Sequence, residues 1–433
     1  MTDKTIRQVQ LANKASIKLA GASTALKNRA LNEVAIALEK NKNKILAANK
    51  KDIKNAKTLK DVLIKRLKLD NIKINEMIKG INNLIKLEDP VGKTLSAVEL
   101  DKNLELYKVS CPIGVIGVIF ESRPDALVQI SCLCLKSGNS VILKGGKEAL
   151  NSNKILHTII TKAIEPVSNT FKNCIQLIET REQVKKILKL DNYINLLIPR
   201  GSNKFVKYIM DNTKIPVLGH SEGICHVYVD KDANLDKAIK ICLDAKTQYA
   251  SVCNAMETLL VNKSIAAKFL PKIIKKYLEK NVELRLDEKS LKIIKNRKIK
   301  KASEKDWKTE YNDLILSIKI VNDIDEAISH INKYSSKHTD TIITENKATA
   351  EKFLNLVDSS SVMLNCSTRF SDGFRYGLGA EVGISTAKIH ARGPVGLEGL
   401  VIYKYKLIGN DHIVADYTGK SPKRFTHKKL SEK

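Results

Sequence analysis

The sequence predicts an α/β protein with two doubly wound α/β domains and a β-hairpin. Three observations lead to this prediction. The chain has 433 residues, which is too long for a single hydrophobic core. Short apolar strands alternate with helices from residue 113 to residue 218, and a second alternating set runs from residue 225 to residue 365. This alternation is typical of parallel sheets that are covered by helices.

The first element is a helical region over residues 4–88, where apolar residues recur near the 3.6-residue period with lysines between them. Two extended runs follow at residues 96–100 and 104–109. Asp101-Lys102-Asn103 separates them, which indicates a hairpin.

The first alternating region begins with a strand at residues 114–120 and a helix at residues 124–137. Pro124 at the first helical position and Gly138 just past the end are the expected start and stop residues. The later strands and helices are predicted at residues 140–144, 150–164, 174–178, 183–190, 194–198, 204–212 and 216–218. We expect the two domains to meet near residues 219–223, and the basic tail from Ser421 to fray.

Charge and composition bound the possible functions. The formal net charge is +28, which raises the possibility of a nucleic-acid-binding protein. However, lysines far outnumber arginines and are spread over nearly every segment, and no nucleic-acid-binding module is recognisable. We therefore expect solvated lysines and no nucleic-acid partner.

Neither a secretory signal nor a membrane-spanning apolar run is visible, so a cytoplasmic protein without a membrane partner is expected. The eight cysteines are scattered, and the Cys132-Leu133-Cys134 spacing fits neither a zinc pair nor a redox pair. Reduced thiols and no metal site are the expectation.

Cys253 is the strongest candidate for chemistry. It lies on a short polar turn between a predicted helix at residues 235–246 and a predicted strand at residues 258–261. A thiol there is both held rigidly and accessible to substrate, which suits a nucleophile. The alternative is a small apolar filler, as most intracellular cysteines are.

Two glycine-containing turns are candidate phosphate sites. Lys144-Gly145-Gly146-Lys147 follows a strand and precedes a helix, where a parallel sheet binds nucleotides. It lacks the G-x-G-x-x-G pattern, so a simple tight turn is the alternative. Pro199-Arg200-Gly201-Ser202 also stands at the end of a strand and opens a helix.

Several ordered segments together resemble one known family. They are residues 112–124, 135–139, 142–149, 251–255 and 391–394. The sequence resembles the gamma-glutamyl phosphate reductases (glutamate-5-semialdehyde dehydrogenases), a family of the aldehyde dehydrogenase superfamily, over about residues 8–417. The resemblance implies an NADP-binding domain at 1–96 and 111–222 and a catalytic domain at 223–398. It also implies an oligomerisation ribbon at 97–110 and 399–416, which leaves a basic tail at 417–433.

The resemblance implies NADPH-dependent reduction of L-glutamyl 5-phosphate through a thioester on Cys253. Backbone N–H groups around Cys253 and Asn254 would stabilise the oxyanion, and we expect nearby cations to raise the thiolate fraction. His220 stands where related enzymes have the glutamate that activates water. Ser122 replaces their oxyanion asparagine. A hydrolytic aldehyde dehydrogenase is the alternative function.

The resemblance also assigns binding residues. Lys144, Gly145, Gly146 and Lys147 would contact the adenosine side of the cofactor, and the cation at Lys147 favours NADPH. Three further residues match contacts to the pyrophosphate and the nicotinamide ribose, namely Gly201, Ser202 and Glu310.

For the substrate, the candidates are Arg123, Arg369, Arg392 and His220. Arg123 is expected to hold the phosphate, with a surface arginine as the alternative, and Arg369 and Arg392 could instead form structural ion pairs. A homo-oligomer is expected, and the glutamate 5-kinase that makes the substrate is a candidate partner.

Overall fold

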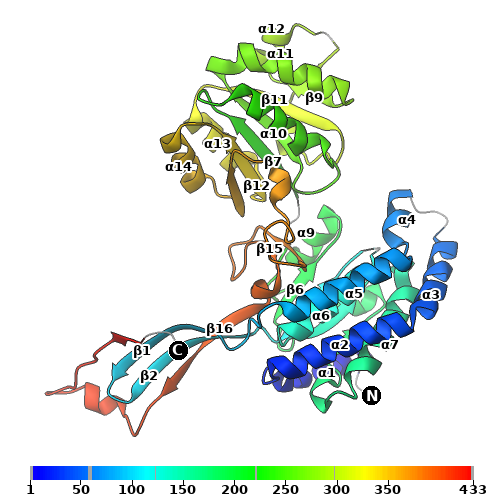
Figure 1. Cartoon of the computed structure of the whole chain (residues 1–433). Helices are drawn as coiled ribbons and strands as arrows, with labels where there is room; N and C mark the ends of the chain where they lie inside the picture. Colours follow the sequence, from blue (N-terminus) through cyan, green and yellow to red (C-terminus); the bar gives the residue numbers. More distant parts are fainter. Residues whose placement is uncertain (1–2, 57–60, 122, 220–221, 297, 431–433) are drawn as a thin grey trace.

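The computed structural model describes residues 3–56, 61–121, 123–219, 222–296 and 298–430. Figure 1 shows two α/β units and a long antiparallel sheet that projects away from both. The N-terminal unit lies at the lower right of the view, and the second unit lies at the top. The predicted fold class is confirmed.

The N-terminal unit is a four-stranded parallel sheet with the order β5-β4-β3-β6. Its strands are β3 (Val115–Ile119), β4 (Ser140–Lys144), β5 (Ile175–Leu177) and β6 (Leu196–Pro199). Its helices are α1 (Lys4–Leu19), α2 (Thr24–Lys40), α3 (Lys42–Asn55), α4 (Asp61–Leu67), α5 (Asn71–Lys86), α6 (Pro124–Lys136), α7 (Leu150–Ile164), α8 (Arg181–Ile187) and α9 (Asn203–Asp211). The alternation predicted from residue 113 onward is confirmed.

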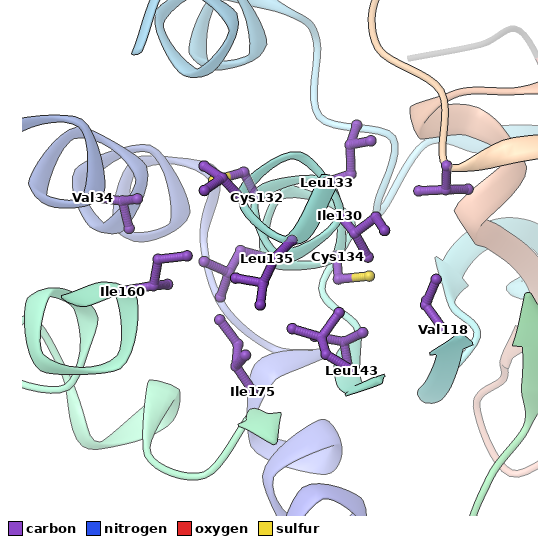
Figure 2. Packing of buried hydrophobic residues seen from close by; sticks show 14 of the residues in the cluster. Val34, Val118, Ile130, Cys132, Leu133, Cys134, Leu135, Leu143, Ile160 and Ile175 are labelled. Carbon is purple, nitrogen blue, oxygen red and sulfur yellow. The ribbon is translucent and has the colours of Figure 1, made fainter. Parts of the chain in front are cut away.

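Helix α6 is the centre of this unit's core, because it is apolar on every side. Figure 2 shows its side chains between the sheet and the surrounding helices, with Val34 of α2 and Ile160 of α7 on one side and Leu143 of β4 nearby. A helix that is apolar all round must be covered all round. The predicted N-terminal helices supply part of this cover, which explains why a helical region precedes the sheet.

The second unit is a seven-stranded parallel sheet with the order β10-β9-β11-β8-β7-β12-β13. Its strands are β7 (Cys225–Val229), β8 (Met256–Asn262), β9 (Glu283–Leu286), β10 (Lys300–Lys301), β11 (Ile315–Val321), β12 (Thr339–Ile343) and β13 (Ser361–Leu364). Its helices are α10 (Leu235–Thr247), α11 (Lys263–Glu279), α12 (Glu288–Ile294), α13 (Ile324–Tyr334) and α14 (Lys347–Leu356). Both β7 and β8 are buried along their whole length, as expected for central parallel strands.

The projecting sheet is antiparallel and has the order β16-β2-β1-β17. Its strands are β1 (Thr94–Asp101), β2 (Leu104–Pro112), β16 (Val401–Ile408) and β17 (Lys428–Lys429). The expectation of a frayed tail is wrong up to Leu430. Lys428 and Lys429 pair with β1, and the backbone N–H of Leu430 donates to the carbonyl of Ala97 (3.0 Å).

The chain returns to the N-terminal unit before it enters β16. Two short strands, β14 (Gly383–Ser385) and β15 (Gly393–Val395), pair with each other there. Four buried residues of this segment belong to the core of the N-terminal unit, namely Val382, Val395, Leu397 and Leu400. The predicted end of the catalytic domain, residue 398, is therefore too late in the chain, because the residues just before it pack into the core of the N-terminal unit.

Within the described ranges, none of the helices is long and apolar enough to cross a membrane. The same part of the chain holds no group of three or more His, Cys, Asp or Glu residues placed to hold a metal ion.

Candidate active site

A cavity of about 1240 Å³ lies where the two units meet. The N-terminal unit lines it with residues that follow the carboxyl ends of β3 and β6, and the second unit lines it with the turn before β8. The returning segment before β15 forms a further wall. The carboxyl edge of a parallel sheet is where ligands bind in this class of fold. The lining includes Glu121, Arg123, Arg200, Gly201, Ser202, Cys253, Glu310 and Glu381.

Cys253 lies in the wall of this cavity and is partly exposed. Cys132 also lines the cavity, but its side chain is 1% exposed within the core around α6. Both neighbours of the turn are as predicted, because α10 ends at Thr247 and β8 begins at Met256. Cys253 is therefore placed as a nucleophile should be, in contact with the cavity and between two rigid elements.

A buried ion pair joins the two ends of the Cys253 turn. Lys246 Nζ lies 2.7 Å from Glu257 Oε2, and both side chains are essentially inaccessible to solvent. The other oxygen of Glu257 accepts a hydrogen bond from the backbone N–H of Asn312 (3.2 Å). The pair thus fixes the thiol turn to the loop that carries Glu310.

Gly223 and Cys225, just before and at the start of β7, also contact the turn that carries Cys253. The thiol of Cys225 donates to the backbone carbonyl of Cys253 (3.2 Å). A Cβ added at Gly223 would lie 2.2 Å from that carbonyl oxygen, so the two backbones touch and only glycine fits.

Nearby cations were expected to lower the pKa of the thiol, but the surroundings of Cys253 raise it. Burial raises the pKa of Cys253 to about 12, and the charges of Glu310 and Glu381 act in the same direction. The backbone N–H of Cys253 and the charge of Arg369 lower the pKa, but they do not outweigh the burial and the carboxylates. These surroundings favour the neutral thiol.

The three predicted substrate arginines have different surroundings. Arg123 lines the cavity and forms an ion pair with Asp125 (2.8 Å). Arg369 is buried behind the thiol turn, where its Nε donates to Gln248 Oε1 (3.0 Å). Arg392 is outside the cavity lining.

Arg392 is held by the segment after α14. Its Nη1 donates to Asp358 Oδ1 (2.9 Å), and its Nη2 donates to the Asp358 carbonyl (3.3 Å). The alternative for Arg392, a structural ion pair, is thus present in the structure, while its Nε has no hydrogen-bond partner among the described residues. That Arg392 binds substrate stays a prediction.

The predicted cofactor residues fall into two groups. Gly201, Ser202 and Glu310 line the cavity, and the Nδ2 of Asn203 donates to Glu310 Oε2 (2.8 Å) across the two units. Lys144, Gly145, Gly146 and Lys147 follow β4 at the same sheet edge but lie outside the cavity lining.

The turn after β4 is tightly built. A Cβ at Gly145 would lie 2.1 Å from Asn153 Nδ2, and a Cβ at Gly146 would lie 1.9 Å from Glu148 Oε1. Burial lowers the pKa of Lys144, and the charge of Glu148 opposes this shift. Lys147 is exposed.

Asn254 is buried and its side chain is not part of the cavity wall. Its Nδ2 donates to the carbonyl of Ser371 (2.8 Å). The side chain therefore fastens the turn to the segment after Arg369, which leaves the backbone of the turn as the candidate oxyanion donor. Ser122 and His220, also predicted as site residues, lie outside the described residues.

Several charged residues of the cavity were absent from the predicted site, among them Arg200 and Glu381. Arg200 was noted only as part of a turn with a possible phosphate contact, and Glu381 was not predicted at all. Glu381 follows Ala380 in a loop without helical or strand pattern, so nothing in the local sequence indicates that it reaches the cavity. Arg200 had a signal, because it lies two residues after the strand predicted at residues 194–198.

The whole chain was compared with known proteins. A sequence profile described as the aldehyde dehydrogenase family matches residues 2–305. The chain belongs to the aldehyde dehydrogenase family. The gamma-glutamyl phosphate reductase of Methanococcoides burtonii is 59% identical over 436 residues, which cover 99% of this chain and 97% of the relative.

Two further family members show the same agreement. The gamma-glutamyl phosphate reductase of Acetivibrio thermocellus is 60% identical, and the match covers 96% of each chain. The crystal structure of the Thermotoga maritima gamma-glutamyl phosphate reductase has 41% identity and a TM-score of 0.92, covering 95% of this chain and all of that one. The predicted family resemblance is confirmed, and both units and the projecting sheet fall within the range of these matches.

Proposed function

We propose that this chain reduces L-glutamyl 5-phosphate to L-glutamate 5-semialdehyde with release of phosphate, the second step of proline biosynthesis from glutamate. The observation that carries the proposal is the partly exposed thiol of Cys253 in the wall of a cavity between two α/β units. The highly identical family members named above are gamma-glutamyl phosphate reductases along nearly their whole length.

In the proposed reaction, the sulfur of Cys253 attacks the acyl carbon and expels phosphate, which leaves a thioester. The turn holds the sulfur in place through the Lys246–Glu257 pair and the contact with Gly223. Backbone N–H groups of the turn and the hydroxyl of Ser122 would stabilise the oxyanion. A thioester accepts hydride more readily than a carboxylate, and collapse of the tetrahedral adduct returns the thiol.

A nicotinamide dinucleotide supplies the hydride when bound, and the residues at the sheet edge fit such a group. The exposed carboxylate of Glu121 accepts a hydrogen bond from the backbone N–H of Ser202 (3.1 Å) at the start of α9. This amide thus already binds a carboxylate oxygen, and a pyrophosphate would take the place of the Glu121 carboxylate there. Gly201, Ser202 and Glu310 would hold the pyrophosphate and the nicotinamide ribose.

NADPH is the proposed form of the dinucleotide. Lys144, Gly145, Gly146 and Lys147 would hold its adenosine side, and the exposed ammonium of Lys147 would favour a 2′-phosphate. Glu148 is the carboxylate that lies against this turn, and it opposes rather than supports a phosphate there. The charge at Lys147 is therefore the feature to test.

The reverse reaction tests the proposed function. Glutamate 5-semialdehyde and NADP⁺ should give NADPH only when phosphate or arsenate is present, because the thioester needs that nucleophile. NADPH formation in phosphate-free buffer would instead indicate a hydrolytic aldehyde dehydrogenase. His220, which stands in place of the water-activating glutamate, is the predicted reason for slow hydrolysis.

Two partners are part of the proposal. The acyl phosphate is reactive, so the glutamate 5-kinase that makes it is a candidate for direct transfer. The four-stranded sheet is the proposed oligomerisation ribbon, because its edge strand β16 is exposed over nearly its whole length.

A further inference from the structure

Five cations line the cavity among the described residues, and they differ in what neutralises them. They are Lys65, Arg66, Lys73, Arg123 and Arg200. Lys65 and Arg66 are exposed on α4. The ammonium of Lys73 donates to the carbonyls of Lys65 (3.1 Å) and Lys68 (2.6 Å), and Arg123 is paired with Asp125.

Arg200 is different from the other four. It is partly buried, it follows β6 directly, and its guanidinium has no hydrogen-bond or ion-pair partner in the described part of the chain. Even partial burial of a cation without a protein partner costs free energy, which an anionic ligand can offset. The open side of Arg200 is the cavity, which makes a ligand the natural partner.

Arg200 lines the same cavity as Cys253 and its neighbours Ser251 and Val252. Pro199, the preceding residue, approaches Gly219, and the chain then reaches Gly223 in contact with the Cys253 backbone. Glu381, another carboxylate of the cavity lining, accepts from the backbone N–H of Gly373 (2.9 Å), and no ion pair joins it to Arg200 within the described residues.

We propose that Arg200 binds the phosphoryl group of the acyl phosphate beside Cys253, and the inorganic phosphate that leaves. This inference rests on the proposed function. A planar guanidinium matches two phosphate oxygens, and it would orient the acyl carbon toward the sulfur. The sulfur–carbon bond forms, the carbon–oxygen bond breaks with its electron pair on phosphate, and the thiol proton ends on the released hydrogen phosphate.

The test is the phosphate dependence of the reverse reaction in Arg200→Gln and Arg200→Lys. Loss of charge-assisted hydrogen bonds should raise the KM for phosphate by about 100-fold in Arg200→Gln. Arg200→Lys should show a smaller rise in the KM for phosphate than Arg200→Gln. The KM for NADP⁺ should stay unchanged in both variants. Arg7→Gln, an exposed arginine on α1, is the matched control and should behave like the wild type.

Three results would overturn the inference. An unchanged phosphate KM would remove Arg200 from the phosphoryl site, and an equal rise in the KM for NADP⁺ would assign it to the cofactor. If the Arg200 variants alkylate Cys253 more slowly with iodoacetamide but keep the same KM for phosphate, Arg200 stabilises the Cys253 thiolate and does not bind phosphate. Activity of the wild type without phosphate would instead refute the proposed function itself.

A measurement on the wild type covers the case in which the variants do not fold. Phenylglyoxal should modify Arg200, and inorganic phosphate at millimolar concentration should protect it, as mapped by peptide mass spectrometry. Equal modification with and without phosphate would contradict the inference.

Discussion

The protonation of Cys253 depends on the neighbours that the turn brings together. Burial and the charges of Glu310 and Glu381 raise its pKa, and the charge of Arg369 only partly offsets them. The neutral thiol is therefore the favoured form at neutral pH.

Alkylation of Cys253 should show this protonation directly. With a pKa of about 12, the thiolate fraction rises about tenfold per pH unit, so the rate with iodoacetamide should rise about tenfold per unit between pH 7 and pH 9. The rate is measured from the modified peptide in ligand-free enzyme, with Cys253→Ser as the blank. A rate that levels off below pH 8 would contradict the raised pKa.

The Lys246–Glu257 pair is expected to be important for stability as well as for geometry. Burial raises the pKa of Glu257 to about 7 and lowers the pKa of Lys246, so each depends on the other to stay charged. Glu257→Gln should lower the free energy of unfolding by about 3 kcal/mol, because it leaves a buried ammonium unpaired. The measurement is urea denaturation.

The double variant Lys246→Met, Glu257→Gln is the control for this pair. It removes the uncompensated charge and should recover most of the lost free energy of unfolding. If the double variant is as unstable as Glu257→Gln, the defect comes from packing and not from charge.

Lys147→Glu tests the choice of dinucleotide. An acidic side chain at this exposed position should repel a 2′-phosphate and shift the ratio of kcat/KM toward NADH by about tenfold. The ratio is measured with both dinucleotides under identical conditions. Lys172→Glu, a change of the same charge at another exposed position, should leave the ratio unchanged.

Some residues of the cavity could be predicted from the sequence, and others could not. Cys253, Gly201, Ser202 and Glu310 were predicted and do line the cavity. Glu381 was not, because a residue in an irregular loop reaches the cavity through tertiary packing alone. Arg392 was assigned to substrate because charge is visible in a sequence, whereas the partner that neutralises it, Asp358, is not.

At the scale of elements, the turn before β8 packs directly against the backbone of Gly223, two residues before β7. Gly223→Ala should displace this turn, because the new Cβ would lie 2.5 Å from the Cα of Cys253. A shift of the sulfur by about 1 Å should lower kcat roughly 100-fold. Steady-state kinetics and dinucleotide binding by fluorescence would separate lost chemistry from lost folding.

Gly21→Ala is the matched control for this variant. The nearest atom to a new Cβ there is the carbonyl oxygen of Lys18 at 3.7 Å, an ordinary contact. This variant should keep wild-type kcat. Normal turnover in Gly223→Ala would mean that the turn tolerates displacement.

Elements with strong periodicity were predictable, and elements defined by their partners were not. β3 is a continuous apolar run, and β4 and β8 have apolar centres, as expected for strands buried on both faces of a parallel sheet. β17 is two lysines, and no local pattern marks it as a strand. It exists because the backbone of β1 offers it hydrogen bonds at the edge of the sheet.

At the scale of the whole molecule, the projecting sheet is the clearest sign of assembly. Figure 1 shows it extending away from both α/β units, with β16 along its outer edge. Tyr403, Tyr405 and Leu407 lie on one face of β16 and are exposed. An exposed apolar edge strand is normally covered by another chain.

The double variant Tyr405→Lys, Leu407→Lys should therefore weaken the oligomer. Two charges on this face would oppose burial, and the mass in solution should fall toward 48.3 kDa, the mass of one chain. Light scattering after gel filtration measures it. Ile17→Lys, at an exposed apolar position on α1, is the control and should leave the mass unchanged.

The return of the chain to its first unit has a consequence for synthesis on the ribosome. Val382, Val395, Leu397 and Leu400 complete the core around α6, and the Nδ2 of Asn139 donates to the Leu400 carbonyl (2.8 Å). These groups are translated long after the rest of that core has emerged. The N-terminal unit therefore cannot complete its core until nearly the whole polypeptide has been made. During this period it exposes apolar surface, and chaperone binding would be most useful.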